Sequence, residues 1–358
     1  MFKQKTILVF NAGSTSLKYQ IFQEKTLRVL AKKDFSNLNY KKNDHLTVFN
    51  KILQEIGDLD LIKIVGHRIV HGGTKFNQST LLISRTVKEI SKFNHLAPLH
   101  NPYALKILAL AQKYFLKTPH LGVFDTSFFS SLPDKAKIYA IPLKYYQKEG
   151  IQRFGFHGIS HYYLAEQAAK KLNKKLTEIN LITCHLGGGA SITAIKNGKA
   201  VDTSMGMTPL EGLVMMTRAG DIDPGLIFHL IKENKLSQEK VYDLLNYESG
   251  IKGLSNQTNF LNLLTKVKQG EAKSKLALEI FIYRIQKYIG AYFGILGKVD
   301  AIVFSGAIGA GDYYTVRKIK KGFKILDQVK ILRIKTDEER AIAKECEIFL
   351  NKKIFSKN

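Results

Sequence analysis

The sequence predicts an α/β protein built from two related domains. Short runs of β-branched and apolar residues alternate with amphipathic stretches along the whole chain of 358 residues, as buried strands alternate with helices. One pattern, an apolar strand followed by a glycine turn and a second strand, starts at Ile7 and again at Leu181. With 45% hydrophobic residues and only 7 prolines, the chain can also bury two cores of ordinary size.

The apolar runs predict strands, and segments with apolar residues every three or four positions predict helices. We expect strands at residues 6–10, 59–65, 118–124, 180–184, 300–304 and 329–334. We expect helices at residues 46–56, 102–116, 160–172, 226–232, 274–296 and 338–349. The last helix follows Thr336-Asp-Glu-Glu339, which reads as a capping box with Thr336 as N-cap and Glu339 at the third helical position.

Two glycine turns are the first functional signal. The first contains Gly13 and lies beside Ser14, Ser16 and Lys18, and the second is the run 187–189. Glycine allows a phosphate to approach closely, and free backbone N–H groups bind its oxygens, so two such turns could hold a triphosphate between two domains. After the second copy, Asn197-Gly198 predicts a hairpin, and an irregular stretch near residues 130–144 predicts the domain boundary.

The net charge of +25 is compatible with nucleic acid, an anionic membrane or an acidic substrate as partner. The basic residues are scattered with no interleaved aromatic stripe, which argues against nucleic acid. No apolar run approaches the ~20 residues of a membrane helix, and no signal peptide is evident, so we expect a cytoplasmic protein that neither spans nor inserts. The 2 cysteines form no Cys-x-x-Cys motif, which argues against a zinc site.

Polar side chains gather at the predicted ends of strands and helices, where α/β proteins mount functional groups. Neither a Walker A motif nor a Rossmann fingerprint accompanies them. The residues in question are His67, Arg68, His71, His100, Asp125, Arg153, His157, His161 and Arg218.

Four of these segments carry a resemblance to a known family. They are residues 11–18, 67–73, 153–161 and 202–224, and together they resemble the acetate kinase family from about residue 6 to 344. The resemblance implies two duplicated domains of the ribonuclease H-like, actin-like ATPase type with an inter-domain cleft. The expected domains are residues 1–138, joined by the C-terminal helix 338–358, and a nucleotide-binding domain at residues 139–337. Members of this family are commonly dimers, so the resemblance implies a homodimer.

The activity implied by the resemblance is reversible phosphoryl transfer from ATP to acetate, giving acetyl phosphate and ADP, with Mg²⁺ as the metal ion or Mn²⁺ as an alternative. Arg68 and Arg218 would hold the carboxylate and the moving phosphoryl group, since a guanidinium pairs two oxygens at once. His157, His100 and His185 would donate hydrogen bonds to phosphoryl oxygens. Acetate is already an anion at pH 7, so direct in-line attack needs no general base.

The remaining site residues also follow from the resemblance. Asp125 would help to place the metal, with Asn11 and Glu338 as further metal residues. Val70, Leu99, Phe156 and Pro209 would form an apolar wall around the methyl group. The nucleotide would be bound by Lys18, Ser14, Ser16, His185, Leu186, Gly187, Gly188, Gly189, Gly306, Ala307, Ile308, Gly309 and Ala310.

Several alternatives stay open at this stage. His67, His71 and His161 can equally be structural histidines, and Glu211, Asp221 and Asp223 can brace the loop that carries Arg218. On the nucleotide side the chain departs from its family: Gly188 stands where Asn is usual, segment 255–260 lacks an acidic residue and an Arg, and no Glu-Asn follows Gly311. Propionate or another short acid as acceptor, another phosphoryl donor, and a nucleotide-impaired protein that only binds acyl phosphate therefore remain alternatives.

Overall fold

The computed structural model describes residues 4–39, 44–56, 58–98 and 100–355, with only the backbone given for residues 328 and 353–355. Two compact units divide the chain. Unit 1 comprises Met1–Ser130, Gly158–Ser160 and Asp337–Asn358, and unit 2 comprises Ser131–His157 and His161–Thr336. Among the described residues, no helix combines the length and the apolar character that crossing a bilayer requires.

Unit 1 is built on a sheet with the strand order β3-β2-β1-β4-β6-β5. Its strands are β1 (Thr6–Gly13), β2 (Ser16–Gln23), β3 (Val29–Phe35), β4 (Ile62–Ile69), β5 (Thr80–Leu81) and β6 (His120–Phe124). β1, β4 and β6 run parallel, whereas β2, β3 and β5 are antiparallel to their neighbours. The carboxyl ends of three adjacent strands therefore meet at one edge of the sheet.

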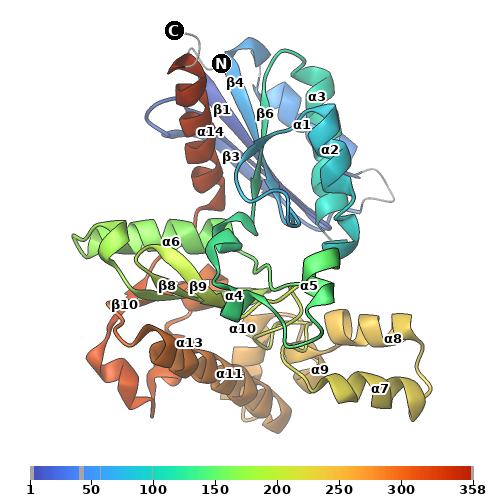
Figure 1. Cartoon of the computed structure of the whole chain (residues 1–358), viewed down its shortest axis with the longest axis vertical. Helices are drawn as coiled ribbons and strands as arrows, with labels where there is room; N and C mark the ends of the chain where they lie inside the picture. Colours follow the sequence, from blue (N-terminus) through green and yellow to red (C-terminus); the bar gives the residue numbers. More distant parts are fainter. Residues whose placement is uncertain (1–3, 40–43, 57, 99, 356–358) are drawn as a thin grey trace. The chain divides into compact units, whose positions relative to one another are not determined.

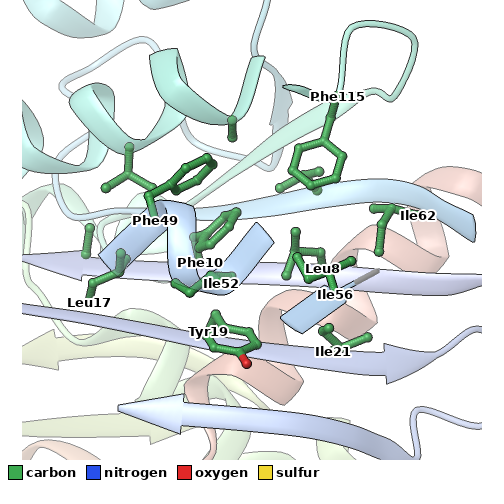
Figure 2. Packing of buried hydrophobic residues seen from close by; sticks show 14 of the residues in the cluster. Leu8, Phe10, Leu17, Tyr19, Ile21, Phe49, Ile52, Ile56, Ile62 and Phe115 are labelled. Carbon is green, nitrogen blue, oxygen red and sulfur yellow. The ribbon is translucent and has the colours of Figure 1, made fainter. Parts of the chain in front are cut away.

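The helices of unit 1 cover both faces of this sheet. They are α1 (Asp44–Ile56), α2 (Ser84–Ser91), α3 (Asn101–Tyr114) and α14 (Glu338–Phe355). On one face, Leu8 and Phe10 of β1 pack with Phe49 and Ile52 of α1, as Figure 2 shows. The rings of Phe10 and Phe49 lie 5.5 Å apart, centroid to centroid.

The other face is covered by α14, dark red in Figure 1, which packs on β1 and β4. Ile342 and Cys346 of α14 share a core with Ile7 of β1. A Cβ at Gly66 would lie 2.7 Å from Ile342 Cγ2 and 2.8 Å from Cys346 Sγ, so only glycine lets the helix lie this close to β4. This packing brings the first residues of α14 to the edge where the parallel strands end.

Unit 2 repeats the arrangement with the strand order β11-β10-β7-β8-β9. Its strands are β7 (Leu181–Leu186), β8 (Ala190–Lys196), β9 (Lys199–Thr203), β10 (Ala301–Ser305) and β11 (Lys330–Arg333). As in unit 1, the first strand pairs with an antiparallel hairpin on one side and with parallel strands on the other. The internal duplication predicted from the glycine turns is thus confirmed at the level of sheet topology.

The helices of unit 2 are α4 (Asp134–Lys137), α5 (Lys144–Glu149), α7 (Pro224–Lys232), α8 (Gln238–Asp243), α9 (Gly250–Ser255), α10 (Phe260–Lys268), α11 (Ala272–Leu296), α12 (Gly306–Gly309) and α13 (Tyr313–Lys320). α6 (Gly158–Lys171) has its first three residues in unit 1 and the rest in unit 2. The long helix α11 packs on β7 and β8. Each predicted strand and helix is present with shifted ends, and residues 59–61, predicted as the start of a strand, form a 3₁₀ turn before β4. The predicted hairpin turns at Asn197 (φ +52°) and Gly198 (φ +76°) between β8 and β9.

Short helical turns complete the chain. Among the described residues, 3₁₀ turns are η2 (Leu59–Leu61), η3 (Asn94–Leu96), η4 (Ser127–Ser131), η5 (Leu176–Glu178) and η7 (Lys324–Gln328), and η6 (Leu244–Glu248) is a π-helical turn.

Candidate active site

A charged cluster lies in unit 1 at the carboxyl ends of β1, β4 and β6. Asn11 is near the end of β1, Arg68 is the penultimate residue of β4, and Asp125 follows β6. The register places Phe10 beside His67 and Arg68 beside Val123, so the three side chains leave neighbouring strands at nearly the same level. Polar residues at this edge of an α/β sheet are typical of binding sites.

Arg68 is the centre of this cluster. Its Nη2 lies 2.6 Å from Asp125 Oδ2 and its Nε 3.3 Å from Asp125 Oδ1, a two-point contact with the carboxylate. Its Nη1 lies 3.2 Å from Asn11 Oδ1 and 3.2 Å from Glu338 Oε2. Arg68 thereby links two carboxylates that come from β6 and from α14.

Burial and the charge of the partner have opposite effects on the pKa values of Arg68 and Asp125. Burial alone would lower the pKa of Arg68, but the carboxylates of Asp125 and Glu338 outweigh it and raise that pKa, so the guanidinium stays charged. Burial raises the pKa of Asp125 to about 6, and the Arg68 charge limits this rise. Both groups are therefore ionised at neutral pH.

The N-terminus of α14 differs from the predicted capping box. Asp337, the residue directly before α14, caps the helix, because Asp337 Oδ1 accepts from Arg340 N at 3.0 Å. Glu339 is then the second helical residue, and its side chain is 8% exposed. Glu339 Oε1 accepts from Asn11 Nδ2 at 2.7 Å, while Glu338 Oε2 lies 3.3 Å from the same nitrogen. The carboxylate of Glu339, predicted only to cap the helix, also joins the charged cluster.

The first glycine turn, Ser14-Thr15, connects β1 to β2. Lys18 on β2 is opposite Asn11 in the register. Its Nζ lies 3.1 Å from Asp34 Oδ2 in an exposed ion pair. A Cβ at Gly13 would lie 3.0 Å from Ser16 Oγ, so the turn is tight. His100, also in unit 1, precedes α3 as its N-cap, and its carbonyl oxygen accepts from Ala104 N.

A second cluster lies in unit 2 around the glycine turn between β7 and β8. His157 precedes α6 in a left-handed backbone conformation (φ +58°), and its ring stacks on that of His185 with centroids 4.5 Å apart. A Cβ at Gly189 would lie 3.4 Å from His157 Nε2 and 3.6 Å from Arg218 Nη1. The glycine turn, an imidazole and a guanidinium therefore border one small space.

Arg218 is partly buried, yet the described part of the chain shows no ion pair between it and a carboxylate. Its Nη1 donates to Pro209 O at 3.3 Å and contacts Met215 Sδ at 3.6 Å. Burial lowers the pKa of Arg218, although an arginine remains charged at neutral pH. A buried cation of this kind is balanced when an anion binds.

The loop that carries Arg218 is braced by buried polar contacts. Glu211 pairs with Arg153, and its other oxygen accepts from Tyr139 Oη at 2.6 Å. Asp221 Oδ1 accepts from Gly212 N at 2.8 Å and its Oδ2 from Tyr288 Oη at 2.8 Å. Asp223 caps α7 by accepting from Gly225 N. These contacts agree with the alternative in which the three acidic residues support the loop.

The third glycine turn begins at Gly306, directly after β10, which is the parallel neighbour of β7. Gly306 has φ +78°, and a Cβ there would lie 2.3 Å from Leu186 O. A Cβ added at Gly309, at the end of α12, would lie 3.5 Å from Leu186 Cβ. The turn after β10 therefore packs against Leu186, the residue directly before the turn at 187–189, whereas a Cβ at Gly188 would meet nothing within 4 Å.

The predicted apolar wall is only partly described. Val70 follows β4 in unit 1, and Phe156 and Pro209 belong to unit 2. Val70 and Phe156 are buried and Pro209 is half-buried. Leu99 lies outside the described residues.

The remaining histidines have structural partners. His67 Nε2 lies 3.0 Å from His120 Nδ1, and both rings are buried. His71 exchanges hydrogen bonds with Asn101 through its backbone. His161 contacts Thr183 Oγ1 and Ser191 Oγ. Neither Ser191 nor Glu339 was predicted as a site residue from the sequence. Ser191 is the register partner of His185 in the β7–β8 pair, so aligning the two strands of this hairpin could have indicated it.

Comparisons with known proteins show the family of the chain. The acetokinase family profile matches residues 6–353. The chain belongs to the acetokinase family. It is 41% identical to an acetate kinase of Halothermothrix orenii over 361 residues, which cover 93% of this chain and 89% of that protein.

Solved structures of this family share the fold. A propionate kinase from Francisella tularensis superposes with a TM-score of 0.89 at 33% identity, covering 96% of this chain and 99% of that one. An acetate kinase from Porphyromonas gingivalis gives 0.86 at 32% identity, covering 97% and 100%. The predicted fold, two domains of the actin-like ATPase type, and the predicted family are both confirmed.

Proposed function

We propose that this protein is an Mg²⁺-dependent acetate kinase that transfers a phosphoryl group reversibly between ATP and acetate. The observation that carries the proposal is Arg218, a partly buried guanidinium that has no carboxylate partner among the described residues and lies beside His157 and the glycine turn. Membership in the acetokinase family supports it. The oxygen of acetate forms a bond to the γ-phosphorus while the bond from that phosphorus to the ADP oxygen breaks.

Arg218 and His157 would stabilise the transferring group. The transition state of phosphoryl transfer spreads negative charge over the equatorial oxygens, so pre-positioned donors give most of the catalysis. His157 Nε2 and Arg218 Nη1 both border the position of a Cβ at Gly189, which lets them reach oxygens of one group. The main chain of the turn at residues 187–189 and of the turn after β10 would bind the other phosphates.

The charged cluster of unit 1 would hold the metal and the acetate carboxylate. Asp125, Glu338 and Glu339 place three carboxylates around one guanidinium, so the cluster keeps a negative excess suited to a cation. The described residues form no cage of three protein ligands, but Mg²⁺ commonly binds one or two carboxylates together with water and phosphate oxygens. When bound, Mg²⁺ neutralises charge on the phosphates, and Mn²⁺ could replace it.

The acceptor remains to be measured, because a propionate kinase and an acetate kinase superpose on this chain almost equally well. Incubation with Mg-ATP and acetate, propionate or butyrate, followed by trapping of acyl phosphate with hydroxylamine, tests both readings. We expect acetyl hydroxamate to form fastest. The absence of acyl hydroxamate with every acid would refute a kinase and would favour a protein that only binds acyl phosphate.

The identity of the phosphoryl donor is the second property to be measured. Gly188 offers no side chain, and Asn259 of segment 255–260 is used to cap α10, so few side chains remain for adenosine. We propose that backbone groups of the glycine turns bind ATP well enough without them. Calorimetric titration with ATP, GTP and pyrophosphate decides, and tighter binding of GTP or pyrophosphate than of ATP would show an altered donor.

We also propose a cytoplasmic homodimer. Both cysteines are free and buried, which agrees with a reducing compartment. Light scattering on the purified protein tests the dimer, and a monomeric mass would contradict it.

A further inference from the structure

A run of hydrogen bonds connects the candidate catalytic histidine to the interior of unit 2. His157 Nδ1 lies 2.9 Å from Ser191 Oγ, and the same oxygen lies 2.8 Å from His161 Nε2. His161 Nδ1 in turn lies 2.7 Å from Thr183 Oγ1. Ser191, His161 and Thr183 are each 0% exposed, so water does not compete for these contacts. The sequence gives no reason to link these residues, and the proposed transfer does not use Ser191, His161 or Thr183 directly.

We propose that Ser191 is a positioning residue whose hydroxyl, held by His161, keeps His157 in the neutral form with its proton on Nε2. This inference rests on the proposed role of His157 in phosphoryl transfer. Nδ1 faces Ser191, while Nε2 faces the glycine turn, 3.4 Å from where a Cβ at Gly189 would lie. A proton on Nε2 would therefore point to the place where we expect the phosphoryl oxygens.

The direction of the hydrogen bonds follows from counting hydrogens. Thr183 has one hydroxyl hydrogen, and its Oγ1 is 2.7 Å from His161 Nδ1 but 3.5 Å from Thr193 O. Because hydrogen bonds from hydroxyl groups weaken strongly by 3.5 Å, we assign the hydrogen to the shorter contact. Burial lowers the pKa of His161, so this ring is neutral and carries its single proton on the other nitrogen, Nε2.

His161 Nε2 then donates to Ser191 Oγ, and the hydrogen of Ser191 remains for His157 Nδ1. Neutral His157 must carry its own proton on Nε2. The opposite direction would turn an unprotonated Nε2 toward the phosphoryl group, where its lone pair would repel negative oxygens. A bound anion therefore favours the direction we assign.

The surroundings hold the ring as well as its proton. His157 stacks on His185 of β7, whose register partner on β8 is Ser191. The left-handed backbone of His157 is unfavourable for a residue with a Cβ, and such conformations persist only where neighbouring contacts fix them. Ser191 and His185 thus fix the imidazole from two adjacent strands.

Nitrogen NMR of the wild-type protein tests the assignment directly. Protein labelled with ¹⁵N-histidine is saturated with Mg-ADP and acetate, a mixture that does not react, and the ring signals of His157 are assigned by their loss in His157→Gln. We expect a protonated Nε2 and an unprotonated Nδ1. A proton on Nδ1 of neutral His157 would overturn the proposal.

Kinetics provide the second test. Ser191→Ala should lower kcat about 10- to 100-fold while KM for acetate changes little, because the donor is misdirected in the transition state. Ser191→Thr keeps the hydroxyl and should restore most of kcat. Thr203→Val, which removes another buried hydroxyl from the same sheet, should keep wild-type kcat. A kcat for Ser191→Ala within two-fold of wild type would overturn the proposal.

The role of His157 in the proposed transfer and the positioning role of Ser191 can be refuted independently. Wild-type turnover in His157→Gln would remove His157 from the proposed transfer, whatever its proton position. Loss of turnover in His157→Gln together with full turnover in Ser191→Ala would keep the proposed function and reject only the positioning role.

Discussion

Individual arginines in this chain have opposite electrostatic surroundings. Arg153 is matched by Glu211 and donates to the carbonyl oxygens of Thr203 and Met205. Among the described residues, the side chain of Arg218 contacts a carbonyl oxygen, that of Pro209, and the thioether of Met215. Removing one partner of a buried ion pair leaves the other uncompensated, whereas removing an unmatched buried cation removes a cost. The two arginines should therefore respond differently to the same substitution.

We predict that Arg218→Met abolishes acyl phosphate formation, with a loss on the order of 10³-fold, while the unfolding free energy stays equal or rises. Arg153→Met should instead lower the unfolding free energy by roughly 2–3 kcal/mol. The hydroxamate assay and thermal unfolding followed by circular dichroism measure both effects. Retained turnover in Arg218→Met would show that this guanidinium does not act on the phosphoryl group.

The glycine turn at residues 187–189 offers a second comparison between single residues. An alanine methyl at position 189 would occupy the space between His157 and Arg218, whereas one at Gly188 would meet nothing within 4 Å. We predict that Gly189→Ala lowers kcat/KM for ATP at least about ten-fold, and that Gly188→Ala stays within about two-fold. Neither variant should change the melting temperature by more than a few degrees. Equal activity of the two variants would contradict the proposed place of the phosphoryl group.

Some residue contacts could not be predicted from the sequence. His67 and His120 are far apart in the chain, and their pairing arises only because β4 and β6 are neighbours. Glu339 of α14 fitted a local capping pattern, but its carboxylate accepts a hydrogen bond from Asn11 of β1. Local patterns therefore indicated candidate residues, while the partners of these residues depended on the tertiary arrangement.

At the scale of elements, the sequence was a better guide. Strands buried on both faces are continuous apolar runs, so β1, β7 and β10 could be located from hydrophobicity alone. Short elements of mixed polarity, such as β3 and α8, carry no comparable period and were not predicted. The position of α14 over β1 and β4 depends on Gly66, whose importance no local signal indicates.

The first turn of α14 gives a prediction about the metal. Glu338→Gln removes a carboxylate that lies 3.2 Å from Arg68, and we expect the Mg²⁺ concentration for half-maximal activity to rise at least ten-fold. Glu345→Gln is the control on the same helix, because Glu345 accepts a hydrogen bond from Ser79 Oγ, away from the cluster. Titration of activity with Mg²⁺ measures the effect, and identical curves for the two variants would contradict a metal role for Glu338.

The whole molecule has a net charge of +25, and both units bury neutral histidines. Folding lowers the pKa of His67 and His161 well below the ordinary value and that of His120 to about 4, in each case because of burial. The unfolded chain binds protons at these residues below pH 6.5, but the native state does not. Each histidine therefore stabilises the fold above pH 6.5 and loses this contribution as the pH falls toward 4.

We predict that the unfolding free energy falls by at least about 1.4 kcal/mol per pH unit between pH 6 and 5. Burial also raises the pKa of Asp125, Asp202 and Glu339, so the native state binds a proton first at these carboxylates, which opposes the trend. With His45, whose pKa burial lowers to about 4, four histidines outnumber the three carboxylates. Urea unfolding followed by circular dichroism at several pH values measures the slope. Repulsion among positive charges also grows at acid pH, and 0.5 M salt screens it without affecting buried rings. The slope should therefore persist in salt, and its disappearance would assign the acid sensitivity to surface charge.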